Sequence, residues 1–266
     1  MSDSKHYNLV KIAVALTYLV MVAVNAMATA LPINGITTGD VSDSFPNLFA
    51  PAGITFSIWG LIYLLLAAYT LYQFGLFQQD KGTARKALFT RIGILFSVSS
   101  IANALWIFAW HYYSIGISLL LMLVILALLI TINLQLNSEA LEKREKLFIR
   151  LPFAVYFGWI TVAMVANATS LLVFSGWDAF GISEQSWAAL IIVVGLIIGA
   201  VTTLRLKSYA YGLVIIWAYL GIWIKHTSAT GFNSQYPLVI NTVLISIILM
   251  IAAEGYLLMK SRRSAI

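Results

Sequence analysis

The dominant pattern along the chain is a series of long apolar runs separated by short polar segments. Several runs reach the ~20 apolar residues that an α-helix needs to cross the hydrocarbon core of a bilayer. A transmembrane β-barrel would instead show alternating segments of about 10 residues. The pattern predicts an all-α polytopic membrane protein with eight spans, at approximately 9–30, 52–76, 88–111, 114–136, 149–173, 186–204, 209–225 and 237–259.

Lysine and arginine residues are distributed unevenly between the polar segments. With eight spans, all but one of the 16 Lys and Arg residues fall on one side of the membrane, and Lys225 alone falls on the other. The positive-inside rule places the Lys-rich and Arg-rich side in the cytoplasm. We therefore expect a multi-pass protein of the cytoplasmic membrane with both termini in the cytoplasm.

The first apolar run allows a second interpretation. Lys5 and Lys11 precede it, and Ala28-Thr29-Ala30 ends it with a pattern that signal peptidase also recognises. However, the run from Ile12 is long for the apolar region of a signal peptide. A retained helix is therefore the favoured interpretation, and cleavage is the alternative.

The composition removes several classes of function. Hydrophobic residues make up 61% of the chain, charged residues only 10%, and the mean hydropathy is +0.91, which soluble domains do not reach. There is no cysteine, and His6, His111 and His226 lie too far apart for a metal-binding spacing. The net charge of +6 arises from residues that flank the spans, so membrane lipid and not nucleic acid is the expected partner.

The polar connection 31–50 is about 20 residues long, which exceeds the usual link between two helices. Its Asn34-Gly35 and Gly39-Asp40 pairs are typical of turns. It is either a lid over a site or an ordinary turn-rich outer loop. We expect Pro51 to begin the second helix, because a first-turn proline loses no hydrogen bond; Trp59 would then lie roughly 10 Å below the helix start.

Amide and indole side chains recur at one depth in the outer half of the expected bundle, on several different helices. A single asparagine could simply bond two helices together, at about 0.6 to 2 kcal/mol. The joint pattern instead favours a cavity with apolar walls and few directional donors, which suits a flat, largely hydrophobic ligand. The residues in this layer are Asn25, Asn103, Asn167, Asn241, Trp59, Trp106 and Trp217.

This layer lacks the residues of an enzyme active site. It contains no carboxylate pair, no Ser-His arrangement and no set of metal ligands, so we expect neither catalytic residues nor a bound metal. Glu254 is either a proton-linked transport residue or a side chain that reaches a basic partner at the interface. Lys225 is either an interfacial anchor or a partner for a ligand carboxylate. Residues 137–150 are expected to extend a helix into solvent with intrahelical charge pairs.

Three separated motifs resemble those of one membrane protein family. The second span begins with Phe49-Ala50-Pro51 and carries an aromatic pair with a spacing of four, which places both rings on one helix face. The third span contains Asn-x-x-Trp, and the fifth contains Pro, Trp, Ala and Asn in that order. In these motifs and in their order, the chain is similar to the TspO/MBR family, the tryptophan-rich sensory or translocator proteins; the residues are Trp59 and Tyr63, Asn103 and Trp106, and Pro152, Trp159, Ala163 and Asn167.

The resemblance covers the first five spans and implies a longer, eight-span variant. Members of the family are often homodimers, and each chain has five helices. The resemblance therefore implies that residues 1–175 form a TspO-like part and that residues 176–266 add three helices to a single integral unit. The loop 31–50 departs from the family pattern because it contains no Trp. The family binds tetrapyrroles such as porphyrin and haem, and sterols, beneath this loop. Stress signalling, transport and light-dependent porphyrin breakdown have been ascribed to it.

We therefore predict a membrane binding or sensory protein for a porphyrin-, haem- or sterol-like ligand, which requires no cofactor. The alternative is a small secondary transporter of a hydrophobic or anionic metabolite, with Glu254 and Lys225 as coupling residues. A third possibility, porphyrin breakdown by an enzyme, rests on the resemblance alone. The predicted ligand-binding residues are Asn25, Trp59, Tyr63, Asn103, Trp106, Trp159, Asn167 and Trp217.

Overall fold

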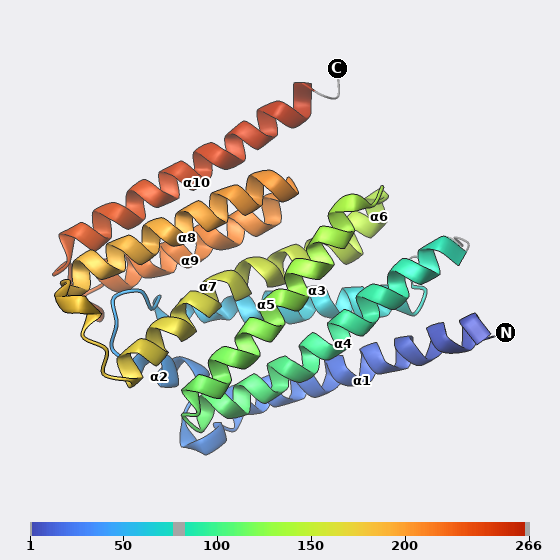
Figure 1. The fold of residues 1–266 in the computed structure, drawn as a ribbon, viewed down its shortest axis with the longest axis horizontal. Helices are drawn as coiled ribbons and strands as arrows, with labels where there is room; N and C mark the ends of the chain where they lie inside the picture. The colour runs from blue at the N-terminus through green and yellow to red at the C-terminus, as the bar shows by residue number, and fades with distance from the viewer. Residues whose placement is uncertain (1, 77–82, 264–266) are drawn as a thin grey trace. The chain divides into compact units, whose positions relative to one another are not determined.

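The computed structural model describes residues 2–76 and 83–263, and this part of the chain is helical without any strand (Figure 1). The all-α prediction is thereby confirmed. Each of the eight apolar runs forms a helix; Lys81, expected on the cytoplasmic side, lies outside the described residues. The long helices are α1 (Ser2–Ala30), α3 (Ile58–Gln73), α4 (Thr83–His111), α5 (Ile115–Ser138), α7 (Leu151–Phe174), α8 (Glu184–Leu206), α9 (Tyr209–Thr227) and α10 (Pro237–Arg263).

Short helical segments occupy the connections between the long helices. They are the 3-10 turns η1 (Ile33–Gly35), η2 (Gly53–Ser57) and η4 (Ala179–Gly181), the short helices α2 (Thr38–Asp43) and α6 (Lys143–Glu145), and the π-helical turn η3 (Lys146–Arg150).

Seven helices of the described residues are long and apolar enough to cross a membrane, counting η2 with α3 and α6 with α7. The remaining long helix, α9, is 19 residues long and is not among these seven. Its tyrosines and tryptophans, and Lys225 and His226 in its last turn, make it less apolar than the others. The protein is thus a polytopic helical membrane protein, and the count of eight spans and the orientation of the termini stay predictions.

The chain forms two compact units. The N-terminal unit comprises Met1–Val41 and Trp59–Phe157, and the C-terminal unit comprises Ser42–Ile58 and Gly158–Ile266. Helix α7 runs through both, and the connection between α1 and α3 is divided at residue 41. The predicted division into 1–175 and 176–266 stays a prediction, but the structure shows that 42–58 groups with the C-terminal helices.

The N-terminal unit is built around α4, which packs against both α1 and α5 (Figure 1). Gly93 permits the close approach of α4 to its neighbours, because a Cβ there would lie 2.7 Å from Val10 and 2.9 Å from the Gln73 side chain. An aromatic core completes the packing. The ring of Tyr69 lies 5.3 Å from that of Phe96 and 4.7 Å from that of Phe153, both edge to face, the arrangement that aromatic pairs prefer.

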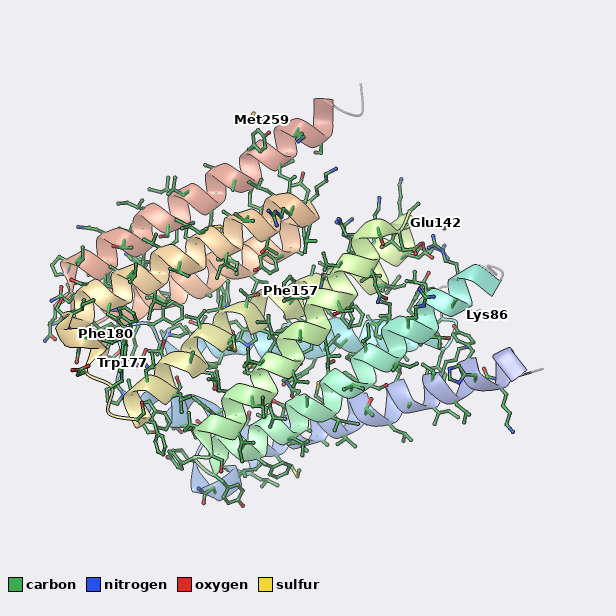
Figure 2. All side chains as sticks on the ribbon, viewed as in Figure 1. Lys86, Glu142, Phe157, Trp177, Phe180 and Met259 are labelled. Atoms are coloured by element: carbon green, nitrogen blue, oxygen red, sulfur yellow. The ribbon has the colours of Figure 1, made fainter. Side chains whose placement is uncertain are left out.

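The connection between α5 and α7 contradicts the solvated helical extension expected at 137–150. Helix α5 ends at Ser138, and Glu142, visible in Figure 2, caps the next helical turn through a capping box with Glu145. Glu145 is buried, and its Oε1 lies 3.1 Å from Nε of Arg85 in α4. Glu145 therefore pairs with a different element, because the turn after Ser138 directs its side chain inward.

The C-terminal unit packs α8, α9 and α10 against one another (Figure 1). Tyrosines of α9 add hydrogen bonds to two neighbours: Tyr219 donates its hydroxyl proton to the Ile192 carbonyl of α8 at 2.6 Å, and Tyr211 lies 3.2 Å from the Thr161 hydroxyl of α7. Such interhelical bonds lock the rotation of α9, since a buried hydroxyl needs a partner.

The segment 42–58 lies along α9, and this contact changes how the second apolar run begins. The Ala52 amide donates to the Gly221 carbonyl at 3.0 Å, and Trp217 donates its indole proton to the Thr55 carbonyl at 3.0 Å. These backbone groups are therefore engaged with α9, and only a 3-10 turn forms from Gly53. Helix α3 begins at Ile58, so the expectation that Pro51 begins the helix is wrong.

Candidate functional site

Six side chains of the N-terminal unit form what we call the aromatic-amide cluster: Asn25, Trp59, Tyr63, Asn103, Trp106 and Tyr156. Its centre is a chain of hydrogen bonds. Asn25 Nδ2 donates to Asn103 Oδ1 at 2.7 Å, and Asn103 Nδ2 donates to the Tyr156 hydroxyl at 3.1 Å. This chain joins α1, α4 and α7, and all three side chains are buried. Tyr156, which the sequence did not single out, is thus a member of the site.

The rings of the cluster gather around Trp59. Trp59 stacks on Tyr63 with 5.6 Å between ring centroids and an interplanar angle of 16°. Its ring lies 6.3 Å from that of Trp106 and 6.1 Å from that of Tyr156. Trp106 in turn stacks on Trp110 at 5.9 Å. The result is a continuous aromatic surface beside the buried amides.

Two donors of this surface are unused. Trp106 Nε1 and the Tyr63 hydroxyl are buried and have no hydrogen-bond partner among the described residues. Leaving a buried donor unpaired costs about 1 to 3 kcal/mol, so native proteins rarely do so without a reason. The cluster therefore combines aromatic surface with two donors able to bond an acceptor.

The other three predicted site residues belong to the C-terminal unit. Two of them contact the segment 42–58: the Trp159 ring meets that of Phe56 edge to face at 5.8 Å, and Trp217 bonds the Thr55 carbonyl. Asn167 is buried at 2% exposure, whereas Trp217 is 36% exposed. The structure thus brings together Asn25, Trp59, Tyr63, Asn103 and Trp106, and describes Trp159, Asn167 and Trp217 in a separate unit.

Asn241 does not join the predicted layer. Its side chain is exposed on α10, because the helix turns this position away from α8 and α9. Helical rise predicts how far a residue lies from the end of its helix, but not in which direction its side chain points. The direction of the Asn241 side chain excludes it from the interior.

His111 is fully buried and holds the first half of the connection 31–50. Its Nδ1 donates to the Ile33 carbonyl at 3.0 Å, since a carbonyl can only accept, and its Nε2 then accepts from the Thr38 hydroxyl at 3.0 Å. Asn34 donates to the His111 carbonyl at 2.9 Å, and Trp110 donates to the Thr38 carbonyl at 3.1 Å. Residues 31–41 are therefore fixed to the end of α4.

The second half of the connection is fixed to the end of α9. Lys225 Nζ lies 2.9 Å from Asp43 Oδ1, and His226 Nε2 donates to the Leu48 carbonyl at 2.9 Å. Asn47 shapes the turn between them, because its Oδ1 accepts from the amides of Phe49 and Ala50 at 3.0 and 2.8 Å. The ammonium group of Lys225 thus already has a carboxylate partner within the protein.

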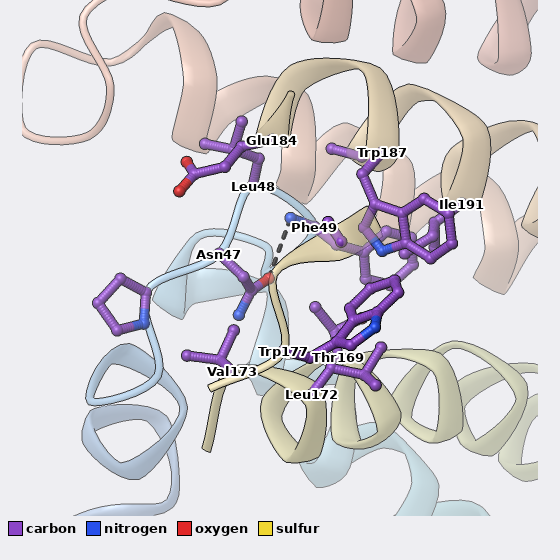
Figure 3. A pocket seen from close by; sticks show the side chains of 13 residues that line it. Asn47, Leu48, Phe49, Thr169, Leu172, Val173, Trp177, Glu184, Trp187 and Ile191 are labelled. Atoms are coloured by element: carbon purple, nitrogen blue, oxygen red, sulfur yellow. Dashed lines mark hydrogen bonds between the residues drawn. The ribbon is translucent and has the colours of Figure 1, made fainter. Parts of the chain in front are cut away.

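A cavity of ≈ 120 Å³ lies in the C-terminal unit, between this turn and the connection from α7 to α8 (Figure 3). The rings of Trp177 and Trp187 form part of its wall, with 4.8 Å between centroids and an angle of 66°. Figure 2 shows Trp177 with Phe180 in the same connection. This cavity could not be predicted from the sequence, because two tryptophans ten residues apart around a polar link are also typical of an interfacial belt. The lining residues are Pro46, Asn47, Leu48, Phe49, Thr169, Leu172, Val173, Trp177, Ala179, Glu184, Trp187, Ala188 and Ile191.

Glu254 of α10 is buried at 8% exposure, and neither carboxyl oxygen has a hydrogen-bond partner among the described residues. Its Oε1 lies directly against Gly212 of α9, where any side chain would collide with it. The Thr203 hydroxyl of α8 faces the same point. A basic partner at the interface is therefore not seen among the described side chains, which do not include those of Arg262 and Arg263.

The fold and the cluster define a polytopic helical membrane protein with a buried aromatic and amide site. Comparison with protein families identifies it further: the model of the family described as TSPO-like protein matches residues 11–256. The chain belongs to this family, and the predicted TspO/MBR relationship is confirmed. The match continues well beyond residue 173, the end of the fifth predicted span, through most of α10. Family membership indicates a membrane protein that binds a ligand or acts as a sensor. No match was found among curated proteins or among solved structures.

Proposed function

We propose that the protein is a sensory protein of the cytoplasmic membrane that binds a flat, largely apolar ligand of the tetrapyrrole or sterol type at the aromatic-amide cluster. The observation that supports this most directly is the pair of unused donors, Trp106 Nε1 and the Tyr63 hydroxyl, beside stacked aromatic rings. A ligand with a broad apolar face and one or more acceptors satisfies both features of this surface.

Each part of the cluster has a distinct task in this proposal. The rings of Trp59 and Trp106 contact the ligand face, and an aromatic contact of this kind contributes about 0.5 to 1.5 kcal/mol beyond area burial. The two free donors bind acceptors such as the propionate carboxylates of a porphyrin or the hydroxyl of a sterol. Asn103 does not need to touch the ligand, because its bonds to Asn25 and Tyr156 hold the helices that carry the rings.

A titration of the purified full chain in detergent with protoporphyrin tests the proposal, by tryptophan quenching and by the porphyrin absorption band. Trp106→Phe removes the N–H and keeps an aromatic ring. Since a hydrogen bond to a charged acceptor contributes about 1.5 to 3 kcal/mol, we expect the Kd to rise at least about tenfold. Trp223→Phe on α9 is the matched control, because Trp223 belongs to no part of the cluster, and it should leave the Kd unchanged.

The result that overturns the proposal is equally specific. Porphyrin binding that is not saturable, or that is equally weakened by Trp106→Phe and by Trp223→Phe, would mean that porphyrin partitions into the micelle or binds elsewhere. Competition by a sterol separates the two ligand types. If the cluster is a sterol site, sterol at matched occupancy displaces the bound porphyrin. Loss of porphyrin under illumination would instead indicate breakdown and an enzyme.

A transporter is the second candidate, and Glu254 favours it. An ionisable side chain within a membrane helix is costly and commonly serves ion or proton movement. Here the carboxyl group meets Gly212 of α9 and Thr203 of α8, so a change in its charge would act on three helices at once. Proton-dependent uptake of a metabolite into vesicles that is abolished by Glu254→Gln would establish this function. Uptake that is unchanged by the substitution would exclude Glu254 as a coupling residue.

A further inference from the structure

We propose that the cavity between Trp177, Trp187 and the turn at Asn47 is a second ligand site, selective for a small organic cation whose apolar body is about one ring in size. This inference goes beyond the proposed function, because neither the residues nor the ligand are shared with the aromatic-amide cluster.

The size of the cavity sets the upper limit for the ligand. An apolar cavity of about 150 Å³ in another protein accommodates benzene, so ≈ 120 Å³ corresponds to about one six-membered ring. A tetrapyrrole joins four five-membered rings in one macrocycle and is too large. The apolar side chains of Leu172, Ile191 and Phe49 supply walls for the ring and not for a polar head group.

The charge around the cavity selects a cation. Glu184 is the one charged residue in the lining, which contains no Lys or Arg. Its carboxylate is exposed and has no ion pair among the described side chains. In the view of Figure 3, Glu184 lies on the opposite side of the cavity from the two indole rings. An ammonium group at the mouth would meet this carboxylate, whereas a ligand carboxylate would be repelled.

The indole rings favour the same type of ligand. Trp is the best aromatic partner for a cation near its face, and cages of aromatic side chains are a recurrent way to bind quaternary ammonium groups. Trp187 adds a further feature, because its Nε1 is buried and has no partner among the described residues. A hydroxyl or carbonyl oxygen on the ligand would accept this hydrogen bond and fix the orientation of the ring.

The cavity wall is held in shape by bonds that do not involve the ligand. Asn47 uses both of its amide atoms in the turn, since Nδ2 donates to the Phe45 carbonyl at 2.8 Å while Oδ1 accepts two backbone amides. On the opposite side, Ser183 caps α8 by accepting from the Ser186 amide. The site is therefore preorganised on both sides, which lowers the entropic cost of binding.

Three probes that share one ring test the charge selectivity: 2-phenylethylamine, 2-phenylethanol and phenylacetate, titrated into the full chain in detergent and followed by tryptophan fluorescence. We expect the amine to bind at least about tenfold more tightly than the carboxylate, with the alcohol between them. Equal affinity of the amine and the carboxylate, or no saturable binding beyond that of empty micelles, would overturn the proposal.

Two substitutions locate the binding. Glu184→Gln should remove most of the preference for the amine while the alcohol still binds, and Trp187→Ala should abolish binding of both. Trp223→Phe is the control for fluorescence changes and should alter neither. If Glu184→Gln retains the full preference, or if a lysolipid displaces all three probes equally, the cavity holds a lipid chain and the proposal fails.

The two ligand proposals can fail independently. Protoporphyrin affinity should not change in Glu184→Gln, and phenylethylamine affinity should not change in Trp106→Phe. Thermal unfolding of each variant shows whether the fold is retained, since Glu184 also lies in the first turn of α8, where a negative charge stabilises the helix.

Discussion

Ala52 and Gly221 are joined by a backbone hydrogen bond of 3.0 Å, which ties the segment 42–58 to the middle of α9. The same segment is held at the helix end by the Lys225–Asp43 ion pair. Asp43 is 55% exposed on its side chain, and exposed ion pairs rarely contribute more than about 1 kcal/mol. The backbone bond and the close packing around Gly221 therefore hold this segment more strongly than the charges do.

Gly221→Ala should detach the segment from α9. The added Cβ would lie within the volume of the Thr55 side chain, which belongs to the 3-10 turn that Ala52 and Thr55 anchor. Overpacking of this kind costs about 1 to 3 kcal/mol, which a thermal unfolding curve resolves.

The matched control for this change is Gly60→Ala in α3, where nothing lies within 4 Å of the added Cβ. Alanine favours a helix over glycine by about 1 kcal/mol, so this variant should be as stable as the natural protein or more so. Similar losses of stability in both variants would show that the contact with Thr55 is not the cause.

Acidification should weaken the attachment of Leu48 through His226, which follows the predicted span 209–225. Burial lowers the pKa of His226 below its ordinary value of 6.5, the adjacent Lys225 charge acts in the same direction, and the bond to the Leu48 carbonyl opposes them. The physical reason is plain: Nε2 already donates to Leu48, and a proton on the buried Nδ1 would find no acceptor among the described residues.

The sign of the pH effect follows from the lowered pKa. Neutral His226 contributes fully to the free energy of unfolding above pH 6.5, its pKa in the unfolded state. This contribution is lost as the pH falls through the lower pKa of the folded state. Thermal unfolding of the natural protein should therefore shift to lower temperature between about pH 7.5 and 5.5, whereas His226→Gln, which can still donate to Leu48, should show a flatter profile. Parallel profiles would assign the pH dependence to other groups.

Much of the fold could be predicted because it depends on local patterns. Each of the eight apolar runs became a helix, since a run of this length and composition has few alternatives in a membrane. The start of α3 could not be predicted. Pro51 is compatible with a helix start, but the bonds of Ala52 and Thr55 to α9 involve residues more than 160 positions away in the chain.

The buried ion pair of Arg85 and Glu145 is a second feature that sequence spacing misassigned, and it supports a strong prediction. Arg85→Met would remove the cation that lies 3.1 Å from the Glu145 carboxylate, which is 1% exposed on its side chain. Removing one partner of a buried pair costs about 3 to 5 kcal/mol. Glu145→Gln should cost less, because Arg85 is 20% exposed and still bonds the Ala140 carbonyl at 2.7 Å.

Arg91→Met provides the control for this pair, because Arg91 belongs to the same helix but is exposed. Its unfolding temperature should stay close to that of the natural protein, within the effect of about 0.5 kcal/mol usual for surface substitutions. An Arg85→Met variant that is no less stable than Arg91→Met would show that Glu145 finds another partner.

The candidate site was predictable in its membership but not in its connections. Helical spacing placed Trp59 with Tyr63 and assigned Asn25 and Asn103 to one depth, and the structure shows both pairs in contact. Depth alone also admitted Asn241, which faces outward. Tyr156 could not be found in this way, because nothing in its local sequence indicates that its hydroxyl meets an amide of α4.

The bonds of Asn103 lead to the last prediction. Asn103→Ala removes its links to both Asn25 and Tyr156, whereas Tyr156→Phe removes only one of them. Interhelical hydrogen bonds in membrane proteins average about 0.6 kcal/mol and reach about 1.7, and the alanine substitution also leaves a small cavity. We expect a loss of about 1 to 3 kcal/mol for Asn103→Ala and a smaller loss for Tyr156→Phe, with Asn241→Ala as the exposed control.

A double-mutant cycle separates the two bonds. If Asn103 and Tyr156 interact directly, the double variant should lose less stability than the sum of the single variants, by about 0.6 to 1.7 kcal/mol. Strict additivity would mean that the 3.1 Å bond contributes nothing to stability and that Asn103 acts through Asn25 alone. In that case α1 and α4 form the rigid part of the cluster, and Tyr156 is free to turn its hydroxyl toward a ligand beside Trp59.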